Sequence, residues 1–161
     1  MVNVYLGLGA NLGDKEQHLR DAVTKIGERI GKVISLSAFY ATAPWGFSSE
    51  NAFLNAVVGV TTELSPLEVL SETQAIEREL GRTAKSIAGA YADRVIDIDL
   101  LLYADAVLKV ESLTLPHPLM TERRFVMEPL AEIAPDVVHP VLGQTLKELF
   151  LNAFCLPSSP Q

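Results

Sequence analysis

The segment that most constrains this chain is Arg94-Val95-Ile96-Asp97-Ile98-Asp99-Leu100-Leu101-Leu102-Tyr103. It is rich in β-branched and other apolar residues, which predicts a buried strand over residues 94–103. Two aspartates interrupt it, with one residue between them. Because side chains alternate between the two faces of a strand, Asp97 and Asp99 project from the same face, with their Cα atoms roughly 6.6 Å apart.

Two carboxylates this close repel each other. At about 5 Å and an effective dielectric constant of roughly 20, two like charges repel by roughly 3 kcal/mol. A cation between them turns that cost into binding, and hard carboxylate oxygens suit Mg²⁺ best. The alternative is a solvated strand face, where paired acids only keep a sheet edge soluble. The other residues of that face, Val95 and Leu101, are apolar, which favours the metal site.

Length and charge narrow the class of protein. A chain of 161 residues is most simply one domain, 1–161, with a frayed tail over 153–161 that is rich in Pro and Ser at its end. The net charge of -7 argues against broad binding to nucleic acid or to anionic membranes. It allows one anionic ligand, provided that a divalent metal and local arginines neutralise that ligand.

Cysteine content and hydropathy bear on the compartment. The single cysteine, Cys155, rules out an internal disulfide and suits a reducing cytosol. The N-terminal residues lack the basic and long apolar regions of a signal peptide. No uninterrupted apolar run approaches the length that spans a membrane. These features predict a cytoplasmic protein with no membrane and no nucleic-acid partner.

The hydrophobic pattern predicts alternating strands and helices. A first helix begins after Asp14 and ends at Gly31, and a second begins at Ser65 and ends at Gly81. After residue 103 we expect a short hairpin partner at 107–110, an irregular segment at 113–118, and helices at 122–133 and 144–153. The expected strands are 2–8, 32–43, 53–62 and 94–103.

This order, β-α-β-β-α-β, is the ferredoxin-like arrangement of an α+β fold. In it the helices cover one face of an antiparallel sheet, and the C-terminal helices are additional. The other face is left for a ligand. Fold alone does not select a function.

Three local features have both a functional and a structural interpretation. The stretch Gly7-Leu8-Gly9-Ala10-Asn11-Leu12-Gly13 matches neither the dinucleotide fingerprint nor the lysine-bearing phosphate loop, so a tight turn is favoured. Asn55 shares a strand face with Phe53 and must either find hydrogen-bond partners or face a ligand. His117 lies between two prolines; it suits a phosphate contact, although a lone histidine is more often a surface or core residue.

Five segments, in order and at consistent distances, resemble one known family. They are Gly7-Leu8-Gly9-Ala10-Asn11-Leu12-Gly13, Ser37-Ala38-Phe39-Tyr40-Ala41-Thr42, Phe53-Leu54-Asn55-Ala56, Arg94-Val95-Ile96-Asp97-Ile98-Asp99-Leu100 and Leu113-Thr114-Leu115-Pro116-His117. The family is 6-hydroxymethyl-7,8-dihydropterin pyrophosphokinase of folate biosynthesis, and the resemblance runs from Tyr5 to about Phe150. It implies transfer of the β,γ-pyrophosphoryl group of ATP to the hydroxymethyl group of the pterin, giving AMP and the pterin diphosphate.

The resemblance also implies roles for individual residues. Asp97 and Asp99 match carboxylates that hold two Mg²⁺ ions between ATP and the pterin alcohol, and Arg82 and Arg94 match catalytic arginines that act on the phosphates. In the family the pterin lies between two aromatic rings while Asn55 contacts its polar edge. The residues on the nucleotide side are Gln74, Glu77, Arg82, Tyr91, Arg94, Leu100, Thr114, His117 and Arg123. The residues on the pterin side are Thr42, Pro44, Trp45, Phe53, Asn55 and Phe125.

The departures from the family pattern are local. Tyr91-Ala92-Asp93 stands where the family commonly shows Trp-Gly-Pro, and Ser112 stands where an arginine often contacts ATP. The segment from Arg82 to Arg94 is about two residues longer than usual, an easy change for a surface loop. We expect residues 82–93 to form a loop that closes over ATP, with Tyr91 as its apolar anchor.

Two other functions compete with this interpretation. A metal-dependent phosphohydrolase could use the same acid pair on water, but it predicts further acids or histidines around the metals. A non-catalytic binding module predicts no metal dependence. The expected partners are the small molecules ATP and 6-hydroxymethyl-7,8-dihydropterin, and contact with neighbouring folate-pathway enzymes is a further hypothesis.

Overall fold

A computed structural model describes residues 1–42, 52–81 and 95–155 of the chain. Five strands in these residues form one antiparallel sheet with the order β2-β4-β1-β5, and β3 pairs with the first residues of β4. The strands are β1 (Val2–Ala10), β2 (Gly31–Leu36), β3 (Tyr40–Thr42), β4 (Phe53–Thr62) and β5 (Asp97–Tyr103).

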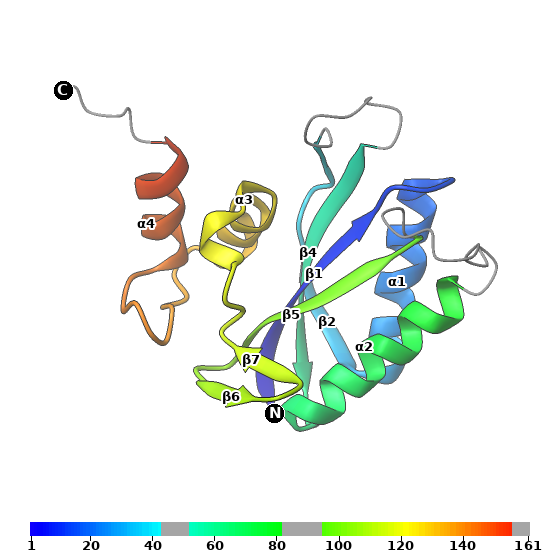
Figure 1. The fold of residues 1–161 in the computed structure, drawn as a ribbon, viewed down its shortest axis with the longest axis horizontal. Coiled ribbons are helices and arrows are strands. Elements are labelled where there is room, and N and C mark those ends of the chain that lie inside the picture. Colours follow the sequence, from blue (N-terminus) through cyan, green and yellow to red (C-terminus); the bar gives the residue numbers. More distant parts are fainter. Residues whose placement is uncertain (43–51, 82–94, 156–161) are drawn as a thin grey trace.

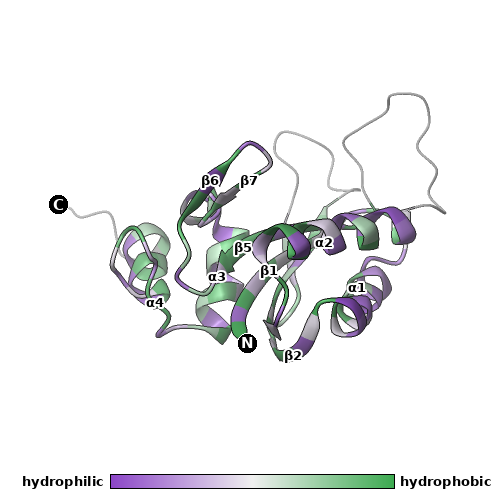
Figure 2. Cartoon of the chain, turned by 90° about the horizontal axis from the view of Figure 1, so that it is seen from below, coloured by the Kyte–Doolittle hydropathy of each residue, from purple (hydrophilic) through white to green (hydrophobic). Residues whose placement is uncertain are grey.

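The sheet lies between two helical layers (Figure 1). The helices α1 (Lys15–Arg29) and α2 (Pro66–Gly81) lie on one face, and α3 (Arg124–Ile133) and α4 (Leu146–Phe150) lie on the other side, a division also visible from below in Figure 2. The predicted α+β class with an antiparallel sheet is confirmed. The face expected to remain free is partly covered, because α3 packs on it against β4.

Local sequence signals explain where α1 and α2 begin. Asp14 caps α1, since its Oδ1 accepts a hydrogen bond of 3.2 Å from the backbone N–H of Gln17. Ser65 and Glu68 form a reciprocal capping box before α2, with backbone-to-side-chain bonds of 2.8 and 3.2 Å. Both predicted helix starts are confirmed.

Charged side chains join the two helices on their outer side. Arg29 of α1 pairs with Glu79 and Glu72 of α2, and Lys25 pairs with Glu79 at 3.2 Å. These groups are each about one-third exposed, so each pair contributes modestly to stability. Figure 2 shows the hydrophilic residues of α1 and α2 as purple stretches.

The period-two alternation of the central strand divides the core. Val4, Leu6 and Leu8 of β1 pack in a cluster with α1 and α2, whereas Tyr5 packs in a second cluster with the buried face of α3. In β1, the positions that follow Tyr5 on this second face are Gly7 and Gly9. The second face therefore has a gap in its apolar surface at that end of the strand.

The strand expected over 32–43 is divided in the structure. Leu36 pairs with Val58 and Tyr40 pairs with Asn55, so that residues 37–39 stand opposite only two residues of β4. The extra residue forms a bulge. Ser37 stabilises it, because its Oγ accepts a hydrogen bond of 2.9 Å from the backbone N–H of Val57. The bulge divides the predicted strand into β2 and β3.

The first glycine-rich segment was expected to be a turn, and this prediction is wrong for its first half. β1 continues to Ala10 and includes Gly7 and Gly9, because both pair with β4 and β5. The turn is confined to the end of the segment, where Gly13 has a φ of +62°. Gly31 follows the last residue of α1 closely, but its main role is elsewhere: a Cβ there would lie 1.9 Å from Thr61 O of β4.

Two further predictions after β5 are wrong. β6 (Leu108–Val110) does not pair with β5; it pairs with β7 (Leu113–Leu115) in a separate two-stranded sheet. The segment 113–118, expected to be irregular, therefore begins with a strand. The prolines explain why that strand ends at Leu115, since a proline has no N–H to donate to a ladder.

The C-terminal helices begin later than expected. Residues Met120–Glu122 form a 3-10 turn before α3, and Thr145 and Glu148 form a capping box at the start of α4. Helical structure then continues through Leu151–Cys155 as a π-helix, in which the Phe154 ring lies 6.0 Å from that of Phe150. Helical structure thus extends beyond residue 153, the expected end of the last helix, into 154 and 155, which were expected to belong to the tail. None of the described helices combines the length and hydropathy needed to cross a membrane.

Candidate active site

The floor of the candidate site is the end of the central strand. Gly9 stands between Asn55 of β4 and Asp97 of β5, and Gly7 stands beside Asp99 in the same way. A glycine in a strand often marks a place where a ligand comes close to the backbone. Here two glycines leave the strip between β4 and β5 without side chains.

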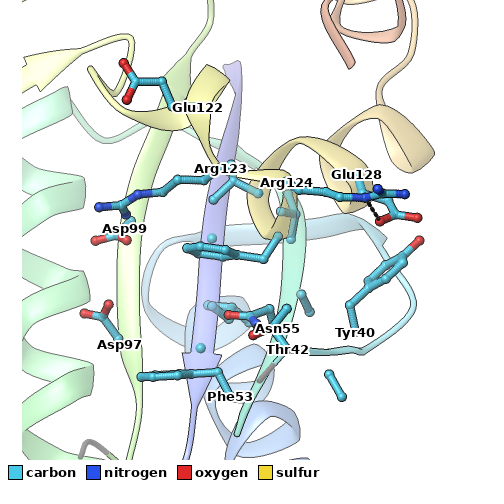
Figure 3. Close-up of a pocket in the computed structure, with 18 of the residues that line it drawn as sticks. Tyr40, Thr42, Phe53, Asn55, Asp97, Asp99, Glu122, Arg123, Arg124 and Glu128 are labelled. Atoms are coloured by element: carbon cyan, nitrogen blue, oxygen red, sulfur yellow. Dashed lines mark hydrogen bonds and ion pairs between the residues drawn. The ribbon is translucent and has the colours of Figure 1, made fainter. Parts of the chain in front are cut away.

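A cavity of about 970 Å³ lies over this floor. The strands form one wall and the start of α3 forms the opposite wall (Figure 3). In Figure 3 the aspartates stand at one side, Thr42 and Asn55 in the middle, and Tyr40 at the far side. The predicted site residues that line this cavity are Thr42, Phe53, Asn55, Asp97, Asp99, Arg123 and Phe125.

The middle of the cavity carries a polar pair. Asn55 is only 5% exposed, and its Nδ2 donates a hydrogen bond of 3.0 Å to Thr42 Oγ1 across the β3–β4 pair. The sequence left open whether Asn55 bonds to a neighbour or faces a ligand. In the structure it does the first and also lines the cavity.

Aromatic residues enter the cavity from two elements. Phe53 is the first residue of β4, and Phe125 lies in the first turn of α3 and is 37% exposed. The Arg123 guanidinium lies 5.7 Å from the centre of the Phe125 ring, a cation–π distance. In Figure 3 the Arg123 side chain extends toward Asp99. Arg123 therefore links the aromatic part of the cavity to the acidic part.

A second, smaller cavity of about 260 Å³ adjoins Asp99. Its lining includes the predicted residues Leu100, Thr114 and His117, together with Ser112. Asp99 lines both cavities. Two ligands that filled them would therefore meet at this carboxylate.

His117 is held in place by its backbone and its ring. Its N–H donates a hydrogen bond of 2.9 Å to Leu101 O, and its Nδ1 accepts one of 3.1 Å from the backbone N–H of Leu119. Burial lowers the pKa of His117, the Arg123 guanidinium lowers it further, and the Asp97 carboxylate acts in the opposite direction. An accepting Nδ1 in a neutral ring leaves the proton on Nε2, where it can be donated to a ligand.

The two predicted residues of α2 lie in different environments. Glu77 Oε2 accepts a hydrogen bond of 2.7 Å from the backbone N–H of Ile98, between the two aspartates. Gln74 is exposed one turn beyond Leu70, which lines the smaller cavity, but Gln74 itself lines neither cavity. The structure thus brings Glu77 to the acidic strand and leaves Gln74 beside the site.

Comparison with known proteins identifies the family. Residues 5–135 match the family model described as 7,8-dihydro-6-hydroxymethylpterin-pyrophosphokinase, HPPK. The chain is 53% identical over 137 residues to the 2-amino-4-hydroxy-6-hydroxymethyldihydropteridine pyrophosphokinase of Porphyromonas gingivalis, covering 84% of this chain and 92% of that protein. The chain belongs to the HPPK family.

Longer proteins contain a similar region. The chain is 41% identical over 147 residues to the folic acid synthesis protein fol1 of Pneumocystis carinii, covering 91% of this chain but 20% of fol1. Its fold matches a crystal structure of Plasmodium falciparum HPPK-DHPS with SDX-DHP, with a TM-score of 0.74 and 19% identity, covering 94% of this chain and 43% of the other. The HPPK chain thus spans less than half the length of these longer relatives.

Family membership gives the reaction. This HPPK is a transferase of folate biosynthesis that transfers the pyrophosphoryl group of ATP to 6-hydroxymethyl-7,8-dihydropterin, giving AMP and the pterin diphosphate. The function predicted from the sequence is confirmed. Five predicted HPPK site residues lie outside the described residues: Pro44, Trp45, Arg82, Tyr91 and Arg94. The expected loop over 82–93 lies outside them as well.

Sequence reasoning missed several residues that line the larger cavity of this HPPK. Gly9 was assigned to a turn, and Gly7 belonged both to the expected strand 2–8 and to that turn segment, although the spacing of two inside an alternating strand could have identified them as neighbours on one face. Tyr40, Glu128 and Phe154 form the far side of the cavity. No sequence signal joins these three, because they come from β3, α3 and the C-terminal π-helix.

Proposed function

We propose that this HPPK binds the pterin in the larger cavity and ATP in the smaller one, so that the reacting groups meet at Asp97 and Asp99. The observation that carries the proposal is that Asp99 lines both cavities. A transfer reaction needs its two substrates side by side, and much of its rate comes from holding them there.

On the pterin side, Phe53 and Phe125 enclose the flat bicycle and Asn55 hydrogen-bonds to its polar edge. Stacked aromatic rings supply apolar contact, while a buried amide rejects a ring that leaves it unpaired. The Thr42 hydroxyl fixes the amide, because Asn55 Nδ2 donates to it. Pro44 and Trp45 complete this side in the proposal.

On the nucleotide side, Leu100, Thr114 and His117 contact ATP in the smaller cavity. His117 in its neutral form donates from Nε2 to a phosphate oxygen, and Arg123 brings a permanent positive charge to the same region. Gln74, Arg82, Tyr91 and Arg94 belong to this side as well, with Arg82 and Arg94 acting on the phosphates. Glu77 serves this side through its bond to the backbone N–H of Ile98.

The acidic pair suits Mg²⁺, which we assign to it as two ions. Both carboxylates project from one face of β5 beside glycines, so oxygen ligands reach them without competing side chains. Within residues 1–42, 52–81 and 95–155 no group of three or more His, Cys, Asp or Glu side chains could hold a metal. Phosphate oxygens and water then supply the remaining ligands, as is usual for Mg²⁺. When bound, Mg²⁺ polarises phosphate oxygens and lowers the pKa of a bound alcohol.

The protein's own groups complete the chemistry. Asp97 and Asp99 hold negative charge where the hydroxymethyl group meets the phosphates, and Arg123 offsets the charge that develops on the transferred group. The aromatic walls exclude water from the pterin hydroxymethyl, which limits hydrolysis of ATP. These groups orient the two substrates for direct transfer.

Binding measurements test the two-cavity assignment. Calorimetry with the pterin and an unreactive ATP analogue, each with Mg²⁺, should give one site per ligand and tighter pterin binding when the analogue is present. Phe53→Ala should weaken pterin binding by a factor of about 10, or about 1.4 kcal/mol, and leave analogue binding within about twofold. Equal weakening of both ligands would contradict a dedicated pterin cavity.

An activity assay separates the competing functions. With Mg²⁺, ATP and pterin, the proposal requires AMP in equal amount to the pterin diphosphate. A phosphohydrolase would instead consume ATP at the same rate without pterin. A binding module would release no AMP at all.

Three broader assignments are part of the same proposal. The ferredoxin-like class is supported by the antiparallel order β2-β4-β1-β5 with α1 and α2 between its strands in sequence. Contact with neighbouring folate-pathway enzymes is supported by the longer HPPK-DHPS chains, in which a similar fold forms part of one polypeptide. A cytoplasmic location is supported by the near absence of cysteine.

A further inference from the structure

Glu132 joins α3 to the region between β2 and β3. It lies in the last turn of α3, and its carboxylate accepts hydrogen bonds from two groups of the β2–β3 region. Tyr40 OH donates to Oε1 at 2.6 Å, and the backbone N–H of Ala38 donates to the two oxygens at 3.1 and 3.3 Å. Hydrogen bonds to a charged acceptor are shorter and stronger than neutral ones, and they fix direction as well as distance.

The bulge explains why the Ala38 N–H is available for this bond. At Ser37 the pairing with β4 becomes irregular: the backbone N–H of Ser37 still donates to Val57 O at 2.9 Å, but Ser37 Oγ accepts from the backbone N–H of Val57. The backbone N–H of the next residue, Ala38, donates to Glu132 and not to β4. Ala38 is exposed, so water would replace a missing acceptor here, and what the Glu132 bond contributes is a fixed position for α3 relative to the bulge. Glu132 is therefore part of the structure of the bulge.

The helix carries Glu132 and Phe125 on the same face. They are seven residues apart, which is close to two helical turns and roughly 10 Å along the axis. Phe125 is at the cavity end of α3, and Glu132 is at the other end. Fixing one end of this face limits how far α3 can rotate or slide, and with it the position of the Phe125 ring.

The other residues of the pterin slot, by which we mean the space between the Phe53 and Phe125 rings next to Asn55, lie on β4. Tyr40 pairs with Asn55, and Thr42 pairs with Phe53, in the short β3–β4 ladder. The strand that Glu132 holds through Tyr40 is therefore the strand beside Phe53 and Asn55. Glu132 thus connects the element that carries one aromatic wall to the elements that carry the other.

Apolar packing alone does not fix the position of α3 relative to β3 and β4. Val126, Met127 and Leu130 bury the opposite side of α3 in the second core cluster, but apolar contact is not directional. Such packing resists large displacements of α3, but it does not set direction as hydrogen bonds do. A shift of about 1 Å at a reacting centre can cost a factor of about 100 in rate.

We infer that Glu132 is a positioning residue for the pterin slot: its bonds to Tyr40 and Ala38 fix α3 against β3 and so set the gap between Phe125 and Phe53. The inference rests on the proposed assignment of the larger cavity to the pterin. Glu132 itself is an exposed residue that does not line this cavity, so it acts through the position of other groups.

The test measures pterin binding and turnover in four variants. Glu132→Ala should raise the pterin KM and Kd about 5- to 10-fold and change ATP affinity and kcat by less than about twofold. Glu132→Gln keeps an oxygen at the Oε1 position that accepts from both donors, so it should restore near wild-type binding. Tyr40→Phe should fall between them. Asp136→Ala, an exposed acid just beyond the same helix, is the control and should bind as the wild type does.

A spectroscopic measurement checks the contact itself. The bond to Glu132, followed by burial and by the charges of Glu132 and Glu128, raises the pKa of Tyr40 to about 12. The Tyr40 titration, obtained as the difference between wild type and Tyr40→Phe, should move toward 10 in Glu132→Ala. A folded Glu132→Ala protein with an unchanged Tyr40 titration would overturn the contact.

Phe53→Ala in the same binding assay distinguishes a wrong assignment of the pterin cavity from a wrong role for Glu132. If Phe53→Ala weakens pterin binding and Glu132→Ala does not, the assignment of the pterin to this cavity is kept and the positioning role of Glu132 is wrong. If neither variant weakens binding, the pterin is elsewhere and both assignments are wrong. A loss in Glu132→Ala that affects ATP and pterin equally would also overturn the inference, because it would indicate a general structural effect.

Discussion

The carboxylate of Glu77 on α2 accepts a hydrogen bond of 2.7 Å from the backbone N–H of Ile98, the residue between Asp97 and Asp99. β5 is the last strand of the sheet on this side, so the N–H groups on its outer edge have no strand to pair with. Glu77 satisfies one of them. Through this bond α2, which lies on the face of the sheet away from α3, fixes the segment of β5 that carries both acids.

The first prediction follows from this bond. Glu77→Ala should lower the free energy of unfolding by about 1–2 kcal/mol, because it removes a charged acceptor from a partly buried donor. It should lower kcat more than it raises the Kd of ATP, whereas a direct ATP contact would raise that Kd most. Urea unfolding without ligands and nucleotide titration separate the two roles. Ser71→Ala on the exposed side of α2 should change neither quantity.

The second prediction concerns the acidic pair. Asp97→Asn should lower turnover by a factor on the order of 100 or more, since it removes a charge from the centre of the reaction. The fold should survive, and stability without Mg²⁺ should hold or rise, because the repulsion between the two carboxylates is relieved. AMP release and thermal unfolding are the measurements. Asp105→Asn, in the exposed turn after β5, is the control, and folded Asp97→Asn with full activity would disprove the assignment.

These two cases show what the sequence can predict. Asp97 and Asp99 share a face because strand geometry has a fixed period of two, and the caps at Asp14 and Ser65 form within four residues of chain. Local rules decide such features. The bond from Glu77 to Ile98 depends on how α2 packs beside β5, and no short-range pattern contains that information.

The wrong predictions have two origins. Gly7 and Gly9 look like turn residues in isolation, and only pairing with β4 on one side and β5 on the other keeps them extended. The contact from Glu132 to Tyr40 joins residues 92 positions apart. The glycine pairing and this contact depend on tertiary structure, which overrides local preference. The β6–β7 pairing is different, because it is a local hairpin closed by the turn at Glu111 and Ser112, a pair that is not among the usual hairpin turn residues.

The third prediction concerns Gly9, which forms part of the floor of the larger cavity. A Cβ at Gly9 would lie 3.1 Å from Asn55 Oδ1 and 3.5 Å from the Phe53 ring, so Gly9→Ala should displace the amide and raise the pterin KM about 10-fold. The ATP KM should change by less than about twofold. Gly27→Ala in α1 is the matched control, with its nearest neighbour at 3.7 Å, and should stabilise the protein by about 0.5–1 kcal/mol. Equal pterin KM values for the two variants would show that the floor does not need glycine.

The last prediction concerns pH and His139, a buried residue between α3 and α4. Its Nδ1 accepts hydrogen bonds from the backbone N–H groups of Val141 and Leu142, at 3.2 and 3.1 Å. Burial lowers the pKa of His139 below its usual 6.5, and a protonated Nδ1 could no longer accept these bonds.

The sign of the pH effect follows from proton binding. Between the lowered pKa of folded His139 and 6.5, the unfolded chain binds more protons, so the stabilisation is complete above pH 6.5 and is lost as the pH falls through that window. One histidine contributes a slope of at most about 1.4 kcal/mol per pH unit.

His139→Asn keeps an acceptor near the Nδ1 position and should flatten the curve of unfolding free energy between pH 7 and 5. His117, whose pKa is also lowered, contributes in the same direction, so His117→Asn and the double variant should flatten it by separate amounts. Parallel curves for wild type and His139→Asn in urea titrations at pH 7, 6 and 5 would show that His139 does not couple folding to pH.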